Sequence, residues 1–285
     1  GPPPSTLDEL RQVLIDYDAA RPRSRQTALG PSELGTPCQQ QIARKIAGAP
    51  RRPVEAPMWA PIQGTAMHAE MERVLNWWNV QLGRERWIIE DTLDIDPGLP
   101  GVPGIIGHGD AYDRDNATVV DWKYVGTSAL NKLRAAKRAG RPPAEQVSPA
   151  YRVQAHLYGR GHERKGREVR YVRLVFLARS HQFDDSEEWT EEYQPDVADE
   201  AILRYYATHD LLAALKVSEN PDFIAAVPAT PDPDTCRWCP YHRPGQPSGW
   251  PGCAGDPAVH ERRVAAFADG LIAPKTPASA ERRSQ

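Results

Sequence analysis

The sequence predicts an α/β core with helical and cysteine-rich additions. Three segments of strand character follow one another at residues 87–95, 104–114 and 118–125, and the turn residues Asp115 and Asn116 between the last two predict an antiparallel hairpin. A helical segment at 148–160, with a Ser cap and Pro149 at its start, then leads to a buried strand at 169–178. Strands that enclose a helix in this order are typical of an α/β fold.

Further helices are predicted on both sides of these strands. The segment 62–82 has the period of an amphipathic helix, and its expected buried stripe is Ala66, Met67, Val74, Leu75 and Trp78. The remaining elements are expected to be helices from residue 6, after residue 38, at 128–139 and at 195–217, and a strand at 188–193. Residues 22–37 and 221 onward have the Pro, Ser and Gly content of loops.

These elements divide the chain into four parts. An N-terminal helical segment occupies residues 1–61, a core 62–220, a cysteine-rich segment 221–273 and a disordered tail 274–285. The formal net charge of −3 over 285 residues excludes a globally basic nucleic-acid binder, so any DNA contact must come from local patches. No apolar run spans a bilayer and no signal peptide opens the chain, so we expect no membrane partner and a cytoplasmic location.

Two carboxylates and a lysine carry the most informative pattern. Asp110 lies in Gly107-His-Gly-Asp110 on one strand of the predicted hairpin, and Asp121-Trp-Lys123 lies on the next. Strand alternation places Asp121 and Lys123 on one face, and hairpin pairing can bring Asp110 to the same edge. Phosphodiester hydrolysis uses carboxylate oxygens to hold Mg²⁺ or Mn²⁺, and an ammonium group to orient water or neutralise the phosphate. An ordinary hairpin with surface charges is the alternative.

Two helices add polar residues to this pattern. His68 ends Gly64-Thr-Ala-Met-His68 on the predicted amphipathic helix, and Gln154 and Tyr158 are four residues apart on the helix after the hairpin. At that spacing Gln154 and Tyr158 share one helical face. Each residue alone is more often part of a routine amphipathic helix, but the whole set in this order favours a catalytic site.

Four cysteines form a second pattern. Cys38 stands near the start of the chain, while Cys236, Cys239 and Cys253 are close together near the end. In a reducing compartment this arrangement favours a metal site over a disulfide. Both an iron–sulfur cluster and structural Zn²⁺ accept four cysteines, and we expect a structural role that clamps the two ends of the chain together.

The order Cys, G-x-x-x-H, G-x-x-D, D-x-K, Q-x-x-x-Y, C-x-x-C, Cys resembles the RecB-like branch of the PD-(D/E)XK nucleases. It is most similar to the iron–sulfur AddB nuclease domain and the CRISPR-associated Cas-four-type exonucleases, including phage-encoded relatives. The resemblance implies a restriction-endonuclease-like core, a mixed sheet flanked by helices, whose N-terminal helices and C-terminal segment are joined by a four-cysteine cluster. This chain has Asp121 where members often have Glu, and a longer gap from Cys239 to Cys253.

The same resemblance assigns roles to individual residues. It implies that His68, Asp110, Asp121 and the Trp122 carbonyl bind Mg²⁺ or Mn²⁺, and that Lys123 is the catalytic lysine. Gln154 and Tyr158 would shape the site and contact DNA. The cysteine ligands Cys38, Cys236, Cys239 and Cys253 would hold a [4Fe–4S] cluster, with Zn²⁺ as the alternative.

The predicted function is therefore a metal-dependent DNA exonuclease of recombination, repair or phage DNA metabolism. A structure- or sequence-specific endonuclease and a non-catalytic DNA-binding or assembly module with structural zinc are the alternatives. DNA, as single strands or duplex ends, is the expected partner, and protein partners in recombination or CRISPR adaptation stay unidentified. Two basic runs are expected to contact phosphates: Lys132, Arg134, Lys137, Arg138 and Arg141, then Arg160, Arg164, Lys165 and Arg167.

Overall fold

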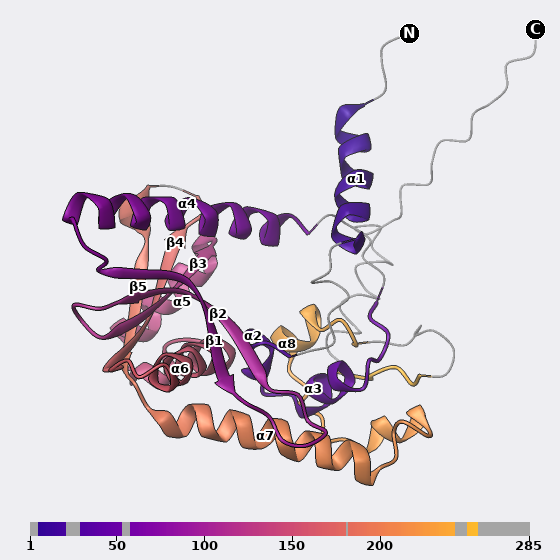
Figure 1. Cartoon of the computed structure of the whole chain (residues 1–285). Helices are drawn as coiled ribbons and strands as arrows, with labels where there is room; N and C mark the ends of the chain where they lie inside the picture. Colours follow the sequence, from indigo (N-terminus) through magenta and orange to yellow (C-terminus); the bar gives the residue numbers. More distant parts are fainter. Residues whose placement is uncertain (1–4, 21–28, 53–57, 181, 243–249, 256–285) are drawn as a thin grey trace, which may run out of the picture.

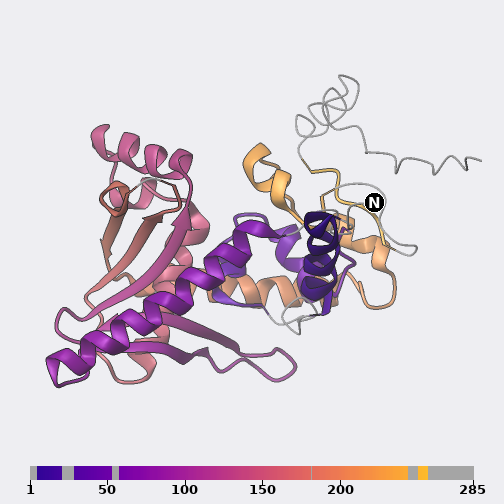
Figure 2. The same cartoon turned by 90° about the horizontal axis from the view of Figure 1, so that it is seen from above.

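The computed structural model describes residues 5–20, 29–52, 58–180, 182–242 and 250–255. The tail expected at 274–285 and much of the cysteine-rich segment therefore lie outside the described residues. Helix α1 (Thr6–Ala20) stands apart from the sheet in both views (Figures 1 and 2). No helix among the described residues has the length and apolar character needed to cross a membrane.

Five strands form one mixed sheet in the order β1-β2-β3-β4-β5. Strands β1, β2 and β3 make an antiparallel meander, β4 runs parallel to β3, and β5 is antiparallel to β4. The bounds are β1 (Trp87–Asp96), β2 (Ile105–Asp113), β3 (Thr118–Val125), β4 (Tyr171–Ala178) and β5 (Glu187–Glu192). The predicted α/β fold with a mixed sheet is confirmed.

Hydrogen bonds to the predicted turn residues Asp115 and Asn116 stabilise the turn between β2 and β3. Asp113 accepts hydrogen bonds from the backbone amide of Asp115 at 3.0 Å and from the side-chain amide of Asn116 at 2.6 Å. Ala117 then adopts a left-handed φ of 48°. Short polar side chains that bond the backbone of their own turn favour such a reversal. The turn fixes the register in which β2 and β3 meet.

Helices cover both faces of the sheet (Figure 1). Helix α6 (Pro149–Arg164) packs against β1, β3 and β4, and α7 (Pro195–Ala214) packs on α6. Helix α4 (Trp59–Leu82) packs on β1 and β3 and crosses over the strands in Figure 2. The other elements between β3 and α7 are α5 (Thr127–Arg138), η2 (Pro143–Glu145) and η3 (Phe183–Asp185).

Strand β3 separates two parts of the core. Val119 is fully buried in the cluster that contains Leu157 of α6, whereas Val120 is buried in the cluster that contains Leu75 of α4. Side chains alternate between the faces of a strand, so Asp121 shares the face of Val119 and looks toward α6. The side chains of Asp121 and Lys123 thus lie on the side of the sheet that α6 covers.

The expected buried stripe of α4 was only partly right. Leu75 is 3% exposed, and Met67 packs against the same cluster, but Val74 is 42% exposed and Trp78 is 37% exposed. Ala66 is also exposed. The helix contacts β1 and β3, and Leu75 is its only buried residue, so just a narrow stripe reaches the sheet.

The N-terminal and C-terminal segments pack together beside the sheet. Helix α3 (Gln39–Ile46) packs against α7 and η4 (Pro221–Ala226), with Ala43 and Ile224 fully buried between them. The segment 22–37, expected to be loop, contains α2 (Pro31–Leu34), which starts at Pro31 and is capped by a hydrogen bond from Gly30 N to the Glu33 carboxylate. The segment after residue 221 also includes α8 (Pro233–Trp238).

Candidate active site and cysteine cavity

The candidate active site lies where β2 and β3 separate. Their ladder ends at the pair Ala111–Val120, so Asp110 and Asp121 occupy the next register position without being paired. Oδ2 of Asp110 accepts a 2.8 Å hydrogen bond from the backbone amide of Trp122. This carboxylate takes the place of a ladder partner, and Asp110 is only 7% exposed as a result. Asp110 therefore stands opposite Asp121 in the strand register, as the hairpin predicted, and their shared role stays a prediction.

His68 reaches the same carboxylate from α4. Its Nδ1 lies 3.2 Å from Oδ1 of Asp110, so the helix and the strand meet as predicted. The hydrogen bond that protonated His68 donates to Asp110 raises the pKa of His68 above its ordinary value, although burial acts in the opposite direction. A proton on His68 must therefore leave before this nitrogen can bind a cation.

Glu90 of β1 is the site residue that the sequence did not reveal. Its carboxylate, with His68 and Asp110, offers three ligand atoms that all lie within 4.8 Å of one another. Glu90 has a left-handed φ of 49°, and it is skipped in the pairing of β1 with β2, between the pairs Ile89–Ala111 and Asp91–Gly109. Loss of water and repulsion from Asp110 raise the pKa of Glu90. Strand alternation cannot predict a side chain turned by such a local distortion.

Asp121 and Lys123 form a buried ion pair. Nζ of Lys123 lies 2.7 Å from Oδ2 of Asp121, whose side chain is 2% exposed. Besides this ammonium, no donor among the described residues reaches Oδ2 of Asp121. Burial raises the pKa of Asp121 to about 6, while the positive charge of Lys123 opposes the rise. A nearby cation stabilises the ionised form of a buried carboxylate such as Asp121.

Helix α6 holds Lys123 from the other side. The ammonium donates a 2.8 Å hydrogen bond to Oε1 of Gln154, and Nε2 of Gln154 donates one of 3.1 Å to the Tyr158 hydroxyl. The Tyr151 ring lies 4.7 Å from the same ammonium, a cation–π contact that the sequence did not indicate. Gln154 and Tyr158 share a face as expected, and both are buried. The lysine is thereby fixed in one position.

The site fits a divalent cation. His68, Glu90 and Asp110 supply one nitrogen and carboxylate oxygens of the kind that Mg²⁺ and Mn²⁺ accept, and Asp121 adds a buried oxygen that only the Lys123 ammonium contacts among the described donors. Asp121 is not one of the compact trio, because its carboxylate is turned toward Lys123. Trp122 reaches the site through its backbone amide. Its predicted carbonyl ligand stays a prediction.

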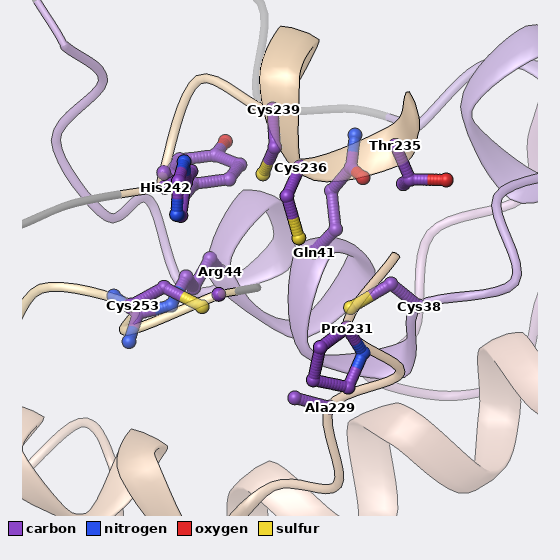
Figure 3. A pocket seen from close by; sticks show the side chains of 12 residues that line it. Cys38, Gln41, Arg44, Ala229, Pro231, Thr235, Cys236, Cys239, His242 and Cys253 are labelled. Atoms are coloured by element: carbon purple, nitrogen blue, oxygen red, sulfur yellow. The ribbon is translucent and has the colours of Figure 1, made fainter. Parts of the chain in front are cut away.

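The four cysteines meet at one cavity. Cys38 directly precedes α3, Cys236 lies on α8, and Cys239 directly follows α8. Together with Cys253 of the C-terminal segment, they line the same pocket. Figure 3 shows their sulfur atoms facing a common space. No three of these thiols lie within 4.8 Å of one another among the described residues. Burial raises the pKa of Cys239 to about 11, which keeps this thiol neutral unless a metal displaces its proton.

Much of the predicted basic surface is engaged within the chain. Arg134 and Lys137 both bind the Glu187 carboxylate, at 2.7 and 3.0 Å. The second run is similarly paired: Arg160 with Asp199, Arg164 with Asp94, and Lys165 and Arg167 with Asp91. These ion pairs tie α5 and α6 to the sheet and to α7. Phosphate contacts by either run stay a prediction.

Several solved structures resemble this fold at low sequence identity. An alkaline exonuclease (LHK-Exo) from Laribacter hongkongensis is 16% identical with a TM-score of 0.44, and the match covers 67% of this chain and 91% of that one. SSO0001 is 14% identical with a TM-score of 0.47, covering 84% and 95%. A phage related exonuclease from Haemophilus somnus 129PT is 11% identical with a TM-score of 0.40, covering 77% and 92%.

These likenesses are too distant to assign an activity to this chain. No family model matches the sequence, and no curated protein matches it. The resemblance to the PD-(D/E)XK nucleases therefore depends on the geometry of the chain's own residues, with Asp110 opposite Asp121 and Lys123 bonded to Gln154.

Proposed function

We propose that this protein is a metal-dependent DNA exonuclease that hydrolyses phosphodiester bonds. The observation that carries the proposal is the convergence of five side chains where β2 and β3 part. His68, Glu90 and Asp110 form a compact ligand set, and the buried pair of Asp121 and Lys123 lies beside it. Recombination, repair or phage DNA metabolism is the proposed setting.

Each side chain has a defined task in this proposal. A divalent cation, Mg²⁺ or Mn²⁺, would supply Lewis acidity when bound by His68, Glu90 and Asp110. Lys123 presents its ammonium to the phosphate, where it offsets the negative charge that grows in the transition state. Asp121 and Gln154 hold that ammonium on both sides, so it need not reorganise during the reaction.

We also propose that the four cysteines bind a structural metal centre, an iron–sulfur cluster with zinc as the alternative. Four thiolates around one zinc ion, at Zn–S distances of about 2.3 Å, would lie about 3.8 Å apart. No three of the thiols approach even within 4.8 Å here, which favours a wider inorganic cluster. Such a centre joins Cys38 to the C-terminal cysteines and adds its binding energy to the folding energy.

The experiment compares two DNA substrates. Anaerobically purified protein is incubated with end-labelled linear DNA and with closed circular single-stranded DNA, in Mg²⁺, Mn²⁺ or EDTA. We expect metal-dependent loss of the linear substrate, an intact circle and no reaction in EDTA. Cutting of the circle would replace the exonuclease with an endonuclease. Intact linear DNA in both metals, with folded protein, would overturn the nuclease proposal.

A further inference from the structure

Arg44 is a buried arginine that forms no ion pair with any carboxylate in the described part of the chain. It lies on α3, is 1% exposed and lines the cavity that the four cysteines share. Its NH1 donates a 2.7 Å hydrogen bond to the backbone carbonyl of Pro251, but Nε and NH2 have no hydrogen-bond acceptor among the described residues. A guanidinium does not lose its proton in proteins, so the residues that the structure describes leave this buried charge uncompensated.

The next residue, Lys45, is a buried cation that does have a carboxylate partner. Lys45, next to Arg44 on α3, pairs with the Glu33 carboxylate at 2.9 Å. Burial lowers the pKa of Arg44, and the groups that oppose this are Tyr241 and three cysteines of the cavity, with Cys253 first. No carboxylate is among them. Among the described residues, the groups that favour the charged form of Arg44 are therefore the side chains around the cavity.

The proposed metal centre supplies the missing charge. Four thiolates carry more negative charge than one zinc ion or an oxidised iron–sulfur cluster carries positive charge, so the centre is anionic in either case. An anion is costly to bury unless a cation and hydrogen-bond donors accompany it. Figure 3 shows Arg44 beside Cys253 at the edge of the space that the four sulfurs face.

We propose that Arg44 is the built-in counter-cation of the four-cysteine centre, donating N–H groups to its sulfur atoms. The inference rests on the metal centre proposed above. Arg44 is thus a positioning residue for a buried anion, and the centre and Arg44 stabilise each other. Without the metal centre, the buried charge of Arg44 destabilises the folded protein. With an iron–sulfur cluster present, its positive charge also favours the reduced, more negative state and raises the reduction potential.

A purely structural role for Arg44 predicts different behaviour. If Arg44 only anchors the Pro251 carbonyl, its loss weakens the metal-free and the loaded protein equally. If it is a counter-cation, its loss weakens only the loaded protein. Arg52 offers the matched control, because its NH2 donates a 3.0 Å hydrogen bond to the Cys239 carbonyl while Arg52 is absent from the cavity lining.

The test measures the thermal midpoint of the whole chain, metal-free and after anaerobic reconstitution with iron(II) and sulfide, or with zinc(II). Wild type, Arg44→Met, Arg44→Lys and Arg52→Met are compared, with iron, sulfide and zinc content determined for each. We expect loading to raise the midpoint of wild type and Arg52→Met by similar amounts. For Arg44→Met the gain should shrink by half or more, while its metal-free midpoint equals or exceeds that of wild type. Arg44→Lys should recover most of the gain.

Two results would overturn the inference in distinguishable ways. A normal gain on loading in Arg44→Met, or an equal fall of its metal-free and loaded midpoints, refutes the role of Arg44 and leaves the metal centre standing. Failure of wild type to take up either metal refutes the centre and Arg44 together. A metal-free Arg44→Met protein that does not fold also contradicts the inference. Where iron is bound, a reduction potential unchanged in Arg44→Met would count against it as well.

Discussion

The ammonium of Lys123 lies 2.7 Å from a carboxylate oxygen of Asp121, and their side chains are only 13% and 2% exposed. Both charges come from one face of β3, two residues apart, beside the point where β2 leaves that strand. Buried charges of this kind are expensive to maintain and cluster at functional sites. Their position next to His68, Glu90 and Asp110 supports the catalytic role that we propose for the pair.

Glu90→Gln should weaken metal binding. Removing one carboxylate from the compact trio leaves His68 and Asp110 to hold the cation, so the Mn²⁺ concentration for half-maximal cleavage should rise by roughly tenfold or more. Asp91→Asn is the control, because Asp91 pairs with Lys165 and Arg167 instead. A metal titration that Glu90→Gln leaves unchanged would remove Glu90 from the site.

Metal affinity should depend on pH in a defined direction. Asp121 has a pKa of about 6, raised by burial, so it is largely ionised above that pH and protonated below it. His68, whose pKa its bond to Asp110 raises, must also lose a proton. Apparent Mn²⁺ affinity, measured by calorimetry, should therefore fall as the pH falls through about 6. Asp121→Asn should flatten this dependence at the acidic end. Affinity that is constant from pH 5 to 8 would contradict the ligand role of His68 and any contribution of the Asp121 charge to cation binding.

Gln154→Leu should slow cleavage without changing metal affinity. The variant removes the 2.8 Å hydrogen bond that fixes the Lys123 ammonium. A misplaced ammonium stabilises the transition state less well, so kcat should fall by roughly tenfold to a hundredfold. Tyr158→Phe loses only the bond to Nε2 of Gln154 and should have a smaller effect. A rise in the required metal concentration with kcat unchanged would assign Gln154 to metal binding instead.

Cys38→Ser should remove metal and stability together. Cys38 is the only one of the four cysteines that lies on the N-terminal side of the core, so its loss should free the C-terminal segment. Metal analysis should show loss of iron and sulfide, or of zinc, with a lower thermal midpoint. Activity per folded molecule should persist, because no cysteine lies among the catalytic side chains. Full metal content in Cys38→Ser would exclude Cys38 as a ligand.

The sequence could predict what depends on alternation and helical spacing. Asp121 and Lys123 share a strand face because side chains alternate, and Gln154 and Tyr158 share a helical face because they are four residues apart. The Asp115–Asn116 turn then placed Asp110 opposite Asp121. These relationships join residues that are close in the sequence or lie on the two strands of one hairpin. The pattern of residue types is therefore enough to predict them.

What could not be predicted depends on tertiary distortion and long-range packing. Glu90 enters the site through a left-handed backbone conformation inside a strand, which no periodicity encodes. The wrong stripe on α4 arose because the sheet covers only one narrow side of that helix, leaving Val74 exposed. The burial of Arg44 results from the packing of α3 against the C-terminal segment, so the sequence does not distinguish it from an ordinary helical arginine. The cysteine cavity was expected from residue order, yet its arginine was not.

The most direct test of the nuclease account is the rate at which Asp110→Asn cleaves end-labelled linear DNA in Mn²⁺. Asparagine retains an oxygen that can accept the hydrogen bond from the Trp122 backbone amide. The strands should therefore stay in place while the negative charge of the ligand is lost. Asp113→Asn is the control: Asp113 is a buried carboxylate on the same strand that binds Arg86. We predict a fall of more than about a hundredfold for Asp110→Asn, since a lost metal ligand removes several kcal/mol of transition-state stabilisation. Asp113→Asn should keep its rate per folded molecule. A well-folded Asp110→Asn protein that cleaves at the wild-type rate would contradict the account.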